Sequence, residues 1–218
     1  MRIKTILTIV TALLVFSVSQ ASAAAPGIFN LVIDASGSVA QEDFQKAKAA
    51  AIFFIDQINK RAQRRPGQLS DWISVNYFGG DDDYQGTRFI NCSNFQEMLS
   101  LARYTMGMDH PGYGNTAIYT AIGKAFFEEI QQEEQLDEPE GTYLKNIILI
   151  TDGADNSSNS QLKQVVQQAF PNKHSNLILI AVGSGSDVSE FRNYADMIIK
   201  IDNFGKLTPA IMMALDQM

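Results

Sequence analysis

The chain has 218 residues, with 24 acidic against 17 basic side chains and a formal net charge of −7 at pH 7. This length suits one α/β domain, and the acidic balance argues against nucleic acid as a partner, because binding phosphates requires a basic surface. Cys92 is the single cysteine, so no intramolecular disulfide forms. We expect Cys92 to be a buried apolar residue rather than half of a bridge to another chain.

The first residues have the pattern of an export signal. Two basic residues within the first four positions precede an apolar stretch over residues 6–18, and small residues follow up to Ala23. This order is the one that a signal peptidase reads, and the apolar stretch is too short for a membrane span of about 20 residues. We therefore expect a signal peptide over residues 1–23 and a periplasmic or secreted domain over residues 24–218, without a transmembrane segment.

Strand-like and helix-like patterns alternate along the rest of the chain. Short apolar runs predict strands, and apolar residues at intervals of three and four predict helices with one buried face. Residues 79–86 read as a polar, glycine-containing turn, so the strands on either side of it are expected to pair as a hairpin. In chain order, strands are predicted at 28–33, 72–78, 87–91, 144–150, 177–182 and 197–201, and helices at 41–59, 94–104, 116–130, 160–170 and 207–218.

This alternation predicts a fold class. Uninterrupted apolar strands separated by helices are typical of a mostly parallel sheet covered on both faces. We expect a Rossmann-like, doubly wound α/β fold with a mainly parallel central sheet, helices on both faces and one antiparallel edge strand.

Oxygen-bearing side chains follow two of the predicted strands and open one helix. Asp34, Ser36 and Ser38 come after the first strand, Asp152 comes after strand 144–150, and Thr116 begins a helix. In open parallel sheets, ligands bind beyond the carboxyl ends of the strands. A set without thiolate or imidazole suits a hard cation, Mg²⁺ first, with Mn²⁺ and Ca²⁺ as alternatives. Taken singly, each loop also fits an ordinary turn or helix cap.

Together, three segments resemble a known family. Val32-Ile33-Asp34-Ala35-Ser36-Gly37-Ser38 resembles the D-x-S-x-S signature of von Willebrand factor type A domains. Gly114-Asn115-Thr116 resembles the family's second metal loop, and Ile150-Thr151-Asp152-Gly153 its third. The resemblance implies a metal-ion-dependent adhesion site: the hydroxyls of Ser36, Ser38 and Thr116 contact the cation, while Asp34 and Asp152 act directly or through water. It also implies a protein partner whose Asp or Glu completes the coordination sphere.

Enzymatic interpretations fit the sequence less well. A phosphatase of the haloacid dehalogenase type would use Asp34 as its nucleophile, but it needs a second acid two positions later, where this chain has Ser36. A serine hydrolase would need a G-x-S-x-G elbow, which does not occur, and the two histidines, His110 and His174, follow no pattern. We therefore predict a non-enzymatic, metal-dependent binding module. The alternatives are a structural subunit of an envelope or surface assembly, and a metal-assisted hydrolase.

Other polar segments lie outside these motifs. Asp81-Asp82-Asp83 is predicted to be an exposed turn rather than a second cation site, and the acidic segment 128–140 a solvated helix end and loop. His110, Pro111 and Tyr113 precede the second metal loop. They are either partner contacts at the rim of the site or part of an ordinary loop.

Overall fold

The computed structural model describes residues 25–170 and 175–218. The expected signal peptide and His174 lie outside these residues. Within them, one sheet has the strand order β3-β2-β1-β5-β6-β7, and β4 also pairs with β2. The strands are β1 (Gly27–Asp34), β2 (Trp72–Phe78), β3 (Tyr84–Gly86), β4 (Ile90–Asn91), β5 (Leu144–Thr151), β6 (Asn176–Val182) and β7 (Met197–Ile201).

The centre of the sheet is parallel. Strand β1 runs parallel to both β2 and β5, and β6 and β7 continue the parallel set, whereas β3 and β4 run antiparallel to β2. Every residue of β1 is buried, as expected for a central strand with helices on both sides. The predicted α/β fold class is thus confirmed.

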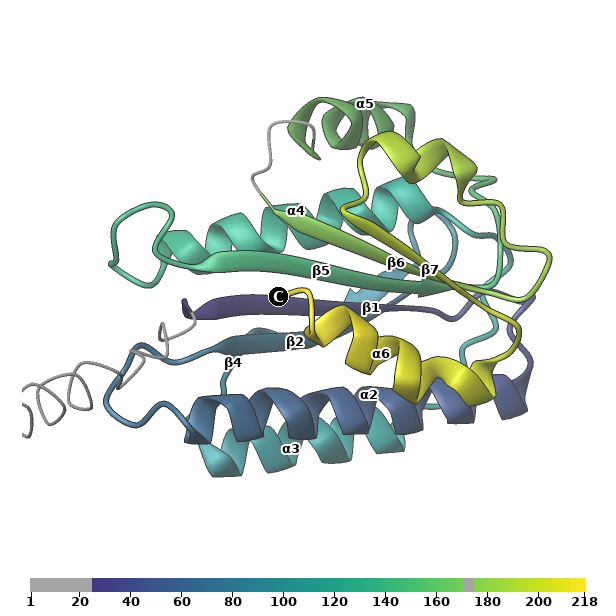
Figure 1. Ribbon diagram of the computed structural model, residues 1–218. Helices are drawn as coiled ribbons and strands as arrows, with labels where there is room; N and C mark the ends of the chain where they lie inside the picture. The colour runs from purple at the N-terminus through teal and green to yellow at the C-terminus, as the bar shows by residue number, and fades with distance from the viewer. Residues whose placement is uncertain (1–24, 171–174) are drawn as a thin grey trace, which may run out of the picture.

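Helices cover both faces of the sheet (Figure 1). On one face lie α2 (Gln41–Gln63), α3 (Phe95–Gly107) and α6 (Leu207–Leu215), and on the other α4 (Ile118–Glu134) and α5 (Ser160–Ala169). Two short 3-10 helices are η2 (Ser189–Asn193) and η3 (Phe204–Lys206). Each face has its own apolar core, so both sides of the sheet are excluded from water. None of the helices described is long and apolar enough to cross a membrane.

Helix α2 shows how the sequence produces this packing. Phe44, Ala47, Ala51, Phe54 and Ile58 recur at intervals of three and four, and all are buried. Acidic residues occupy the first turn and basic residues the last, which complements the helix dipole. Burying each phenylalanine contributes about 1.5–3 kcal/mol to folding, so this apolar face fixes α2 on the sheet.

The antiparallel hairpin differs from the prediction. Strand β3 pairs Tyr84 with Phe78, so the turn covers residues 79–83, and residues 87–89 are not strand. Gly86 was assigned to the turn because of its residue type, yet it lies in the strand opposite Asn76. A Cβ at Gly86 would lie 1.5 Å from Oδ1 of Asn76, so close approach to that side chain explains the glycine.

Two burial predictions have opposite outcomes. Cys92 is 1% exposed, which confirms that it is a buried residue. The acidic segment 128–140 was predicted to be solvated, and this is wrong for Glu129 and Glu133, which are 0% and 8% exposed. Glu129 accepts hydrogen bonds from the Asn146 backbone nitrogen (3.1 Å) and the Ser175 hydroxyl (2.6 Å). Helical spacing alone does not reveal such partners, because they come from β5 and from the residue before β6.

Glu129 is expected to make stability depend on pH. Burial raises its pKa well above the usual 4.5, although the Ser175 hydrogen bond and the Lys145 charge lower it. The folded chain therefore keeps the proton above pH 4.5, where the unfolded chain loses it. For this group, the free energy of unfolding falls as the pH rises from 4.5 to the raised pKa, by at most about 1.4 kcal/mol per pH unit.

Urea unfolding of the wild type and of Glu129→Gln between pH 4.5 and 8 tests this expectation. The glutamine keeps an acceptor for the Asn146 nitrogen but carries no titrating proton, so its stability should fall less over this range. Glu134→Gln, on the exposed face of the same helix, is the control and should follow the wild type. Parallel profiles for the wild type and Glu129→Gln would contradict the prediction.

Candidate metal site

The predicted site residues lie where the chain connections diverge from the sheet. After β1 the chain continues into α2 on one face, and after β5 it continues into α5 on the other (Figure 1). In open parallel sheets, ligands bind at such a point, beyond the carboxyl ends of the two diverging strands, here β1 and β5. Ile33 pairs with Ile150, which sets Asp34 beside Thr151. The Thr151 hydroxyl donates a 2.6 Å hydrogen bond to Oδ2 of Asp34.

The first and third loops meet through side-chain oxygens. Oδ1 of Asp34 accepts a hydrogen bond from the Ser36 backbone nitrogen (2.9 Å), which turns the loop tightly after β1. The hydroxyl oxygens of Ser36 and Ser38 are 3.0 Å apart. The Ser38 hydroxyl donates to Oδ1 of Asp152 over 2.7 Å. Asp34, Ser36, Ser38 and Asp152 therefore form one continuous chain of contacts.

Thr116 contacts the segment after β5 in two ways: its backbone forms hydrogen bonds with Asn156, and its side chain packs against Gly153. The Asn156 side chain accepts a hydrogen bond from the Thr116 nitrogen (3.0 Å), and the Asn156 nitrogen donates to the Thr116 carbonyl (2.9 Å). A Cβ on Gly153 would lie 3.2 Å from the Thr116 hydroxyl oxygen, so the threonine side chain lies directly against the loop that carries Asp152. The Ala117 nitrogen also donates to the Gly79 carbonyl (2.7 Å), which ties this segment to the end of β2.

The loop before Thr116 also packs closely against the first loop. The Tyr113 nitrogen donates to the Ala35 carbonyl (3.1 Å), and Tyr113 and Ser36 form an isolated parallel bridge. A Cβ on Gly79 would lie 2.1 Å from Cβ of Tyr113, so only glycine allows this approach. The His110 ring lies 4.8 Å from the ring of Phe44, a buried core residue, which favours an ordinary loop over a partner contact for His110.

The two carboxyl groups at the site differ in their surroundings. Burial raises the pKa of Asp34 to about 6, against hydrogen bonds from Ser36 and Thr151 that lower it. Burial also raises the pKa of the half-buried Asp152, although the hydrogen bond from Ser38 lowers it. No group of three or more His, Cys, Asp or Glu residues suited to a metal occurs in residues 25–170 and 175–218. A cation here would depend on hydroxyl oxygens as well as on these two carboxylates.

The sequence did not predict the hydrogen bonds that three residues near the site make. Thr151 and Asn156 hold Asp34 and Thr116, as described above. Asp81 lies in a turn, as predicted, but it is half-buried rather than exposed, and it accepts hydrogen bonds from the Thr120 hydroxyl and the Asn159 nitrogen. The Thr120 hydrogen bond lowers the pKa of Asp81. Its partners lie 39 and 78 positions away, so no local pattern marks them.

Comparison with known proteins agrees with this geometry. The family model of the von Willebrand factor type A domain matches residues 30–198. The chain belongs to the von Willebrand factor type A family. The matched range contains all three loops described above. No curated protein matches the chain by sequence.

Solved structures share the fold at low sequence identity. A von Willebrand factor type A protein from Catenulispora acidiphila is 18% identical with a TM-score of 0.67, over 87% of this chain and 42% of that one. Proximal thread matrix protein 1 from the mussel byssus, with a zinc-occupied MIDAS motif, is 17% identical with a TM-score of 0.70, over 88% and 48%. The pilus adhesin SpaC from Lactobacillus rhamnosus GG, in its open conformation, is 12% identical with a TM-score of 0.63, over 88% and 30%. This chain spans less than half the length of each.

Proposed function

We propose that this protein is an exported binding module that captures a protein partner through a divalent cation. The cation is held by Asp34, Ser36, Ser38, Thr116 and Asp152, and the partner contributes an Asp or Glu side chain. The observation that carries the proposal is the unbroken series of hydrogen bonds from Asp34 through Ser36 and Ser38 to Asp152. The last of them joins loops that are 114 positions apart in the sequence. Export is inferred from the signal pattern in residues 1–23.

The spacing of the oxygens supports a small, hard cation. Ligands about 2.1 Å from Mg²⁺ and at right angles to each other lie about 3.0 Å apart. The Ser36 and Ser38 hydroxyl oxygens are 3.0 Å apart, and Ser38 and Asp152 contribute oxygens 2.7 Å apart. A larger ion such as Ca²⁺, with bonds of about 2.4 Å, places ligands at right angles about 3.4 Å apart, and it fits the observed spacing only with the narrower ligand angles of higher coordination numbers. Mg²⁺ is therefore proposed first, with Mn²⁺ and Ca²⁺ as the alternatives.

The charges around this set explain why a partner would supply a carboxylate. Three of the proposed ligands are neutral hydroxyls, which leave the cation's charge uncancelled. Both carboxyl oxygens of Asp34 already accept hydrogen bonds, from Ser36 and Thr151, so Asp34 suits a role through water. Asp152 then compensates only part of the charge. An external carboxylate gains both a coordination bond and charge compensation in a partly buried site.

Two of the similar structures bear on the kind of partner. The mussel protein is a thread matrix protein whose MIDAS motif holds zinc, and SpaC is a pilus adhesin. Because a matrix protein and an adhesin share this fold, a role in adhesion or assembly is proposed for this chain as well. The matrix protein also favours the second candidate, a structural subunit of a surface assembly. Chelation separates the two, because a metal-bridged complex dissociates in EDTA whereas a structural complex persists.

Calorimetric titration of Mg²⁺, Mn²⁺, Ca²⁺ and Zn²⁺ into the purified chain tests the cation site. We expect saturable binding of at least Mg²⁺ or Mn²⁺, and its loss in Asp152→Ala. Asp216→Ala, an exposed carboxylate at the end of α6, removes the same charge far from the loops and should leave binding unchanged. The proposal fails if no cation binds, or if Asp152→Ala binds as the wild type does.

Asn156 is expected to determine how well Thr116 serves as a ligand. Asn156→Ala removes the acceptor for the Thr116 nitrogen and should lower Mg²⁺ affinity by about 10-fold, the lower end of effects seen when residues that orient metal ligands are removed. The control is Asn159→Ala, which removes the side-chain cap of α5 without touching Thr116. It should cost about 1 kcal/mol of stability and leave Mg²⁺ affinity unchanged. Equal affinities in both variants would refute a positioning role for Asn156.

A further inference from the structure

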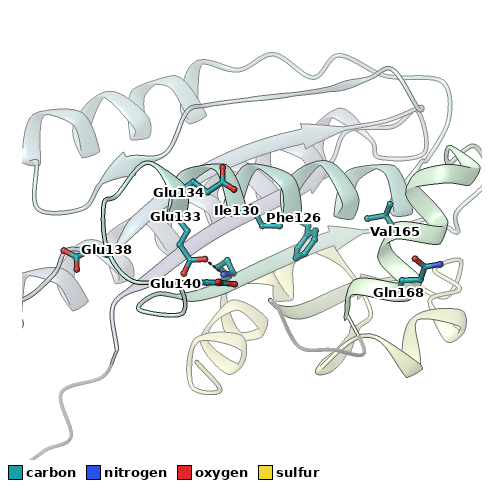
Figure 2. Close-up of a pocket in the computed structure, with 9 residues that line it drawn as sticks. Phe126, Ile130, Glu133, Glu134, Glu138, Glu140, Val165 and Gln168 are labelled. Carbon is teal, nitrogen blue, oxygen red and sulfur yellow. Dashed lines mark hydrogen bonds and ion pairs between the residues drawn. The ribbon is translucent and has the colours of Figure 1, made fainter.

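A cavity of about 710 Å³ lies at the edge of the sheet opposite the metal loops (Figure 2). It is bounded by the carboxyl-terminal half of α4, by α5, and by the segment that leads into β5. Lys145, near the start of β5, lines the cavity, whereas Asp152 follows the end of that strand. The seven residues from Lys145 to Asp152 span about 23 Å when extended. The cavity is therefore separate from the proposed cation site.

Apolar side chains form the inner wall of the cavity. Phe126 and Ile130 project from α4, and Val165 lies across from them on α5 (Figure 2). Phe126 is 6% exposed, and its ring lies 5.5 Å from the ring of Phe170 at the end of α5. This packing fixes the wall in place. It offers an apolar surface that suits an aliphatic or aromatic group.

Carboxylates lie on one side of this apolar wall, toward the end of α4 and the segment into β5 (Figure 2). Glu134, Glu138 and Glu140 line the cavity, and none of the three has an ion-pair partner among the described residues. The one basic residue of the described lining, Lys145, is already paired with the buried Glu133.

The segment that carries these acids is held in place. Glu133 accepts a hydrogen bond from the Gly141 nitrogen (3.1 Å), which fixes the return of the chain toward β5. The cavity thus combines an apolar wall with three carboxylates that have no ion-pair partner within residues 25–170 and 175–218.

We infer that this cavity docks a cationic, partly apolar segment of a protein partner, with an Arg or Lys beside an apolar side chain. The apolar side chain, together with the methylene stem of the basic residue, covers Phe126, Ile130 and Val165. The charged head reaches the rim, where carboxylates accept its hydrogen bonds. Such a residue also relieves repulsion among Glu134, Glu138 and Glu140, whereas an acidic segment would increase it. The recognition is thus opposite in charge to the carboxylate proposed for the metal loops, and it needs no cation.

Titration of the ¹⁵N-labelled full chain with two acetylated peptide amides, Phe-Arg-Phe and Phe-citrulline-Phe, tests this inference by amide chemical shifts. Citrulline keeps the shape of arginine but is neutral. We expect saturable shifts near Ile130, Gly141 and Val165 with the arginine peptide. The citrulline peptide should bind about tenfold more weakly, because its ion pairs are lost. EDTA should change neither result, so this test stands whether or not the metal proposal holds.

Two matched triple variants locate the interaction. Glu134→Gln, Glu138→Gln and Glu140→Gln together should weaken the arginine peptide about tenfold. The control is the triple variant Asp82→Asn, Asp109→Asn and Asp216→Asn, which changes the net charge equally but leaves the cavity intact and should bind as the wild type does. The inference is overturned by equal binding of the two peptides, by equal binding of the two variants, or by shifts outside the cavity. It is also overturned if the same amides shift with protein concentration alone, which would assign the surface to a second copy of the chain.

Discussion

Exchanging Asp34 for asparagine is expected to weaken Mg²⁺ binding about 100-fold, the upper end of the effect of residues that orient metal ligands. The asparagine has nearly the same shape but no charge. Its two side-chain atoms face two hydrogen-bond donors, the Ser36 nitrogen and the Thr151 hydroxyl. Only the amide oxygen can accept from either, so the other contact is lost and the turn after β1 loosens. Calorimetry with Mg²⁺ gives the affinity, and thermal unfolding shows whether the domain remains intact.

The same exchange should cost about 1–3 kcal/mol of stability, because one buried donor loses its acceptor. Asp109→Asn is the matched control: Asp109 is exposed and lies in the segment before the second loop, and its exchange should change neither quantity. Unchanged Mg²⁺ affinity in Asp34→Asn, with the domain folded, would show that this carboxylate does not support a cation. If Asp34→Asn does not fold, Thr151→Val takes its place: it removes the donor to Oδ2 of Asp34 and the acceptor for the Gly153 nitrogen, and it should weaken Mg²⁺ binding about 10-fold.

Much of the fold could be predicted because central strands carry a strong signal. Strands over residues 72–78 and 197–201 have the predicted bounds, and β1, β5 and β6 differ from prediction by one or two residues. Most residues of these strands are apolar, so the pattern depends little on tertiary context. The hairpin could not be placed, because its short strands are polar and Gly86 is required by the approach of Asn76 rather than by a turn.

The sequence predicted where the proposed ligands lie in the fold, but not the residues that hold them in place. Asp34, Ser36, Ser38 and Asp152 are close in sequence to the ends of strands, so the topology alone brings them together. Asn156 supports Thr116 across 40 positions, and nothing in either segment indicates that pairing. The cavity beside α4 could not be predicted for a similar reason: Glu133, which lines it, fits a solvated helix end until β5 brings Lys145 beside it.

Replacing Gly79 by alanine is expected to disturb the site from outside its proposed ligand set. The new Cβ would lie 2.1 Å from Cβ of Tyr113, so the loop before Thr116 must move away from β2. That movement strains the hydrogen bond from the Ala117 nitrogen to the Gly79 carbonyl, which anchors Thr116's neighbour. We expect a loss of about 1–3 kcal/mol in the free energy of unfolding, measured in urea. Mg²⁺ affinity, measured by calorimetry, should fall by about 10-fold, as for other changes that displace a metal ligand.

Two further variants separate a positional effect from a general loss of stability. Gly107→Ala, at the end of α3, places its Cβ in open space and should leave both quantities near the wild-type values. In the double variant Gly79→Ala with Tyr113→Gly, the clashing Cβ is removed. If the contact between these two residues sets the position of Thr116, the double variant binds Mg²⁺ more tightly than Gly79→Ala alone, although Tyr113→Gly by itself loses packing. Strictly additive effects of the two substitutions would instead mean that each acts independently on the loop.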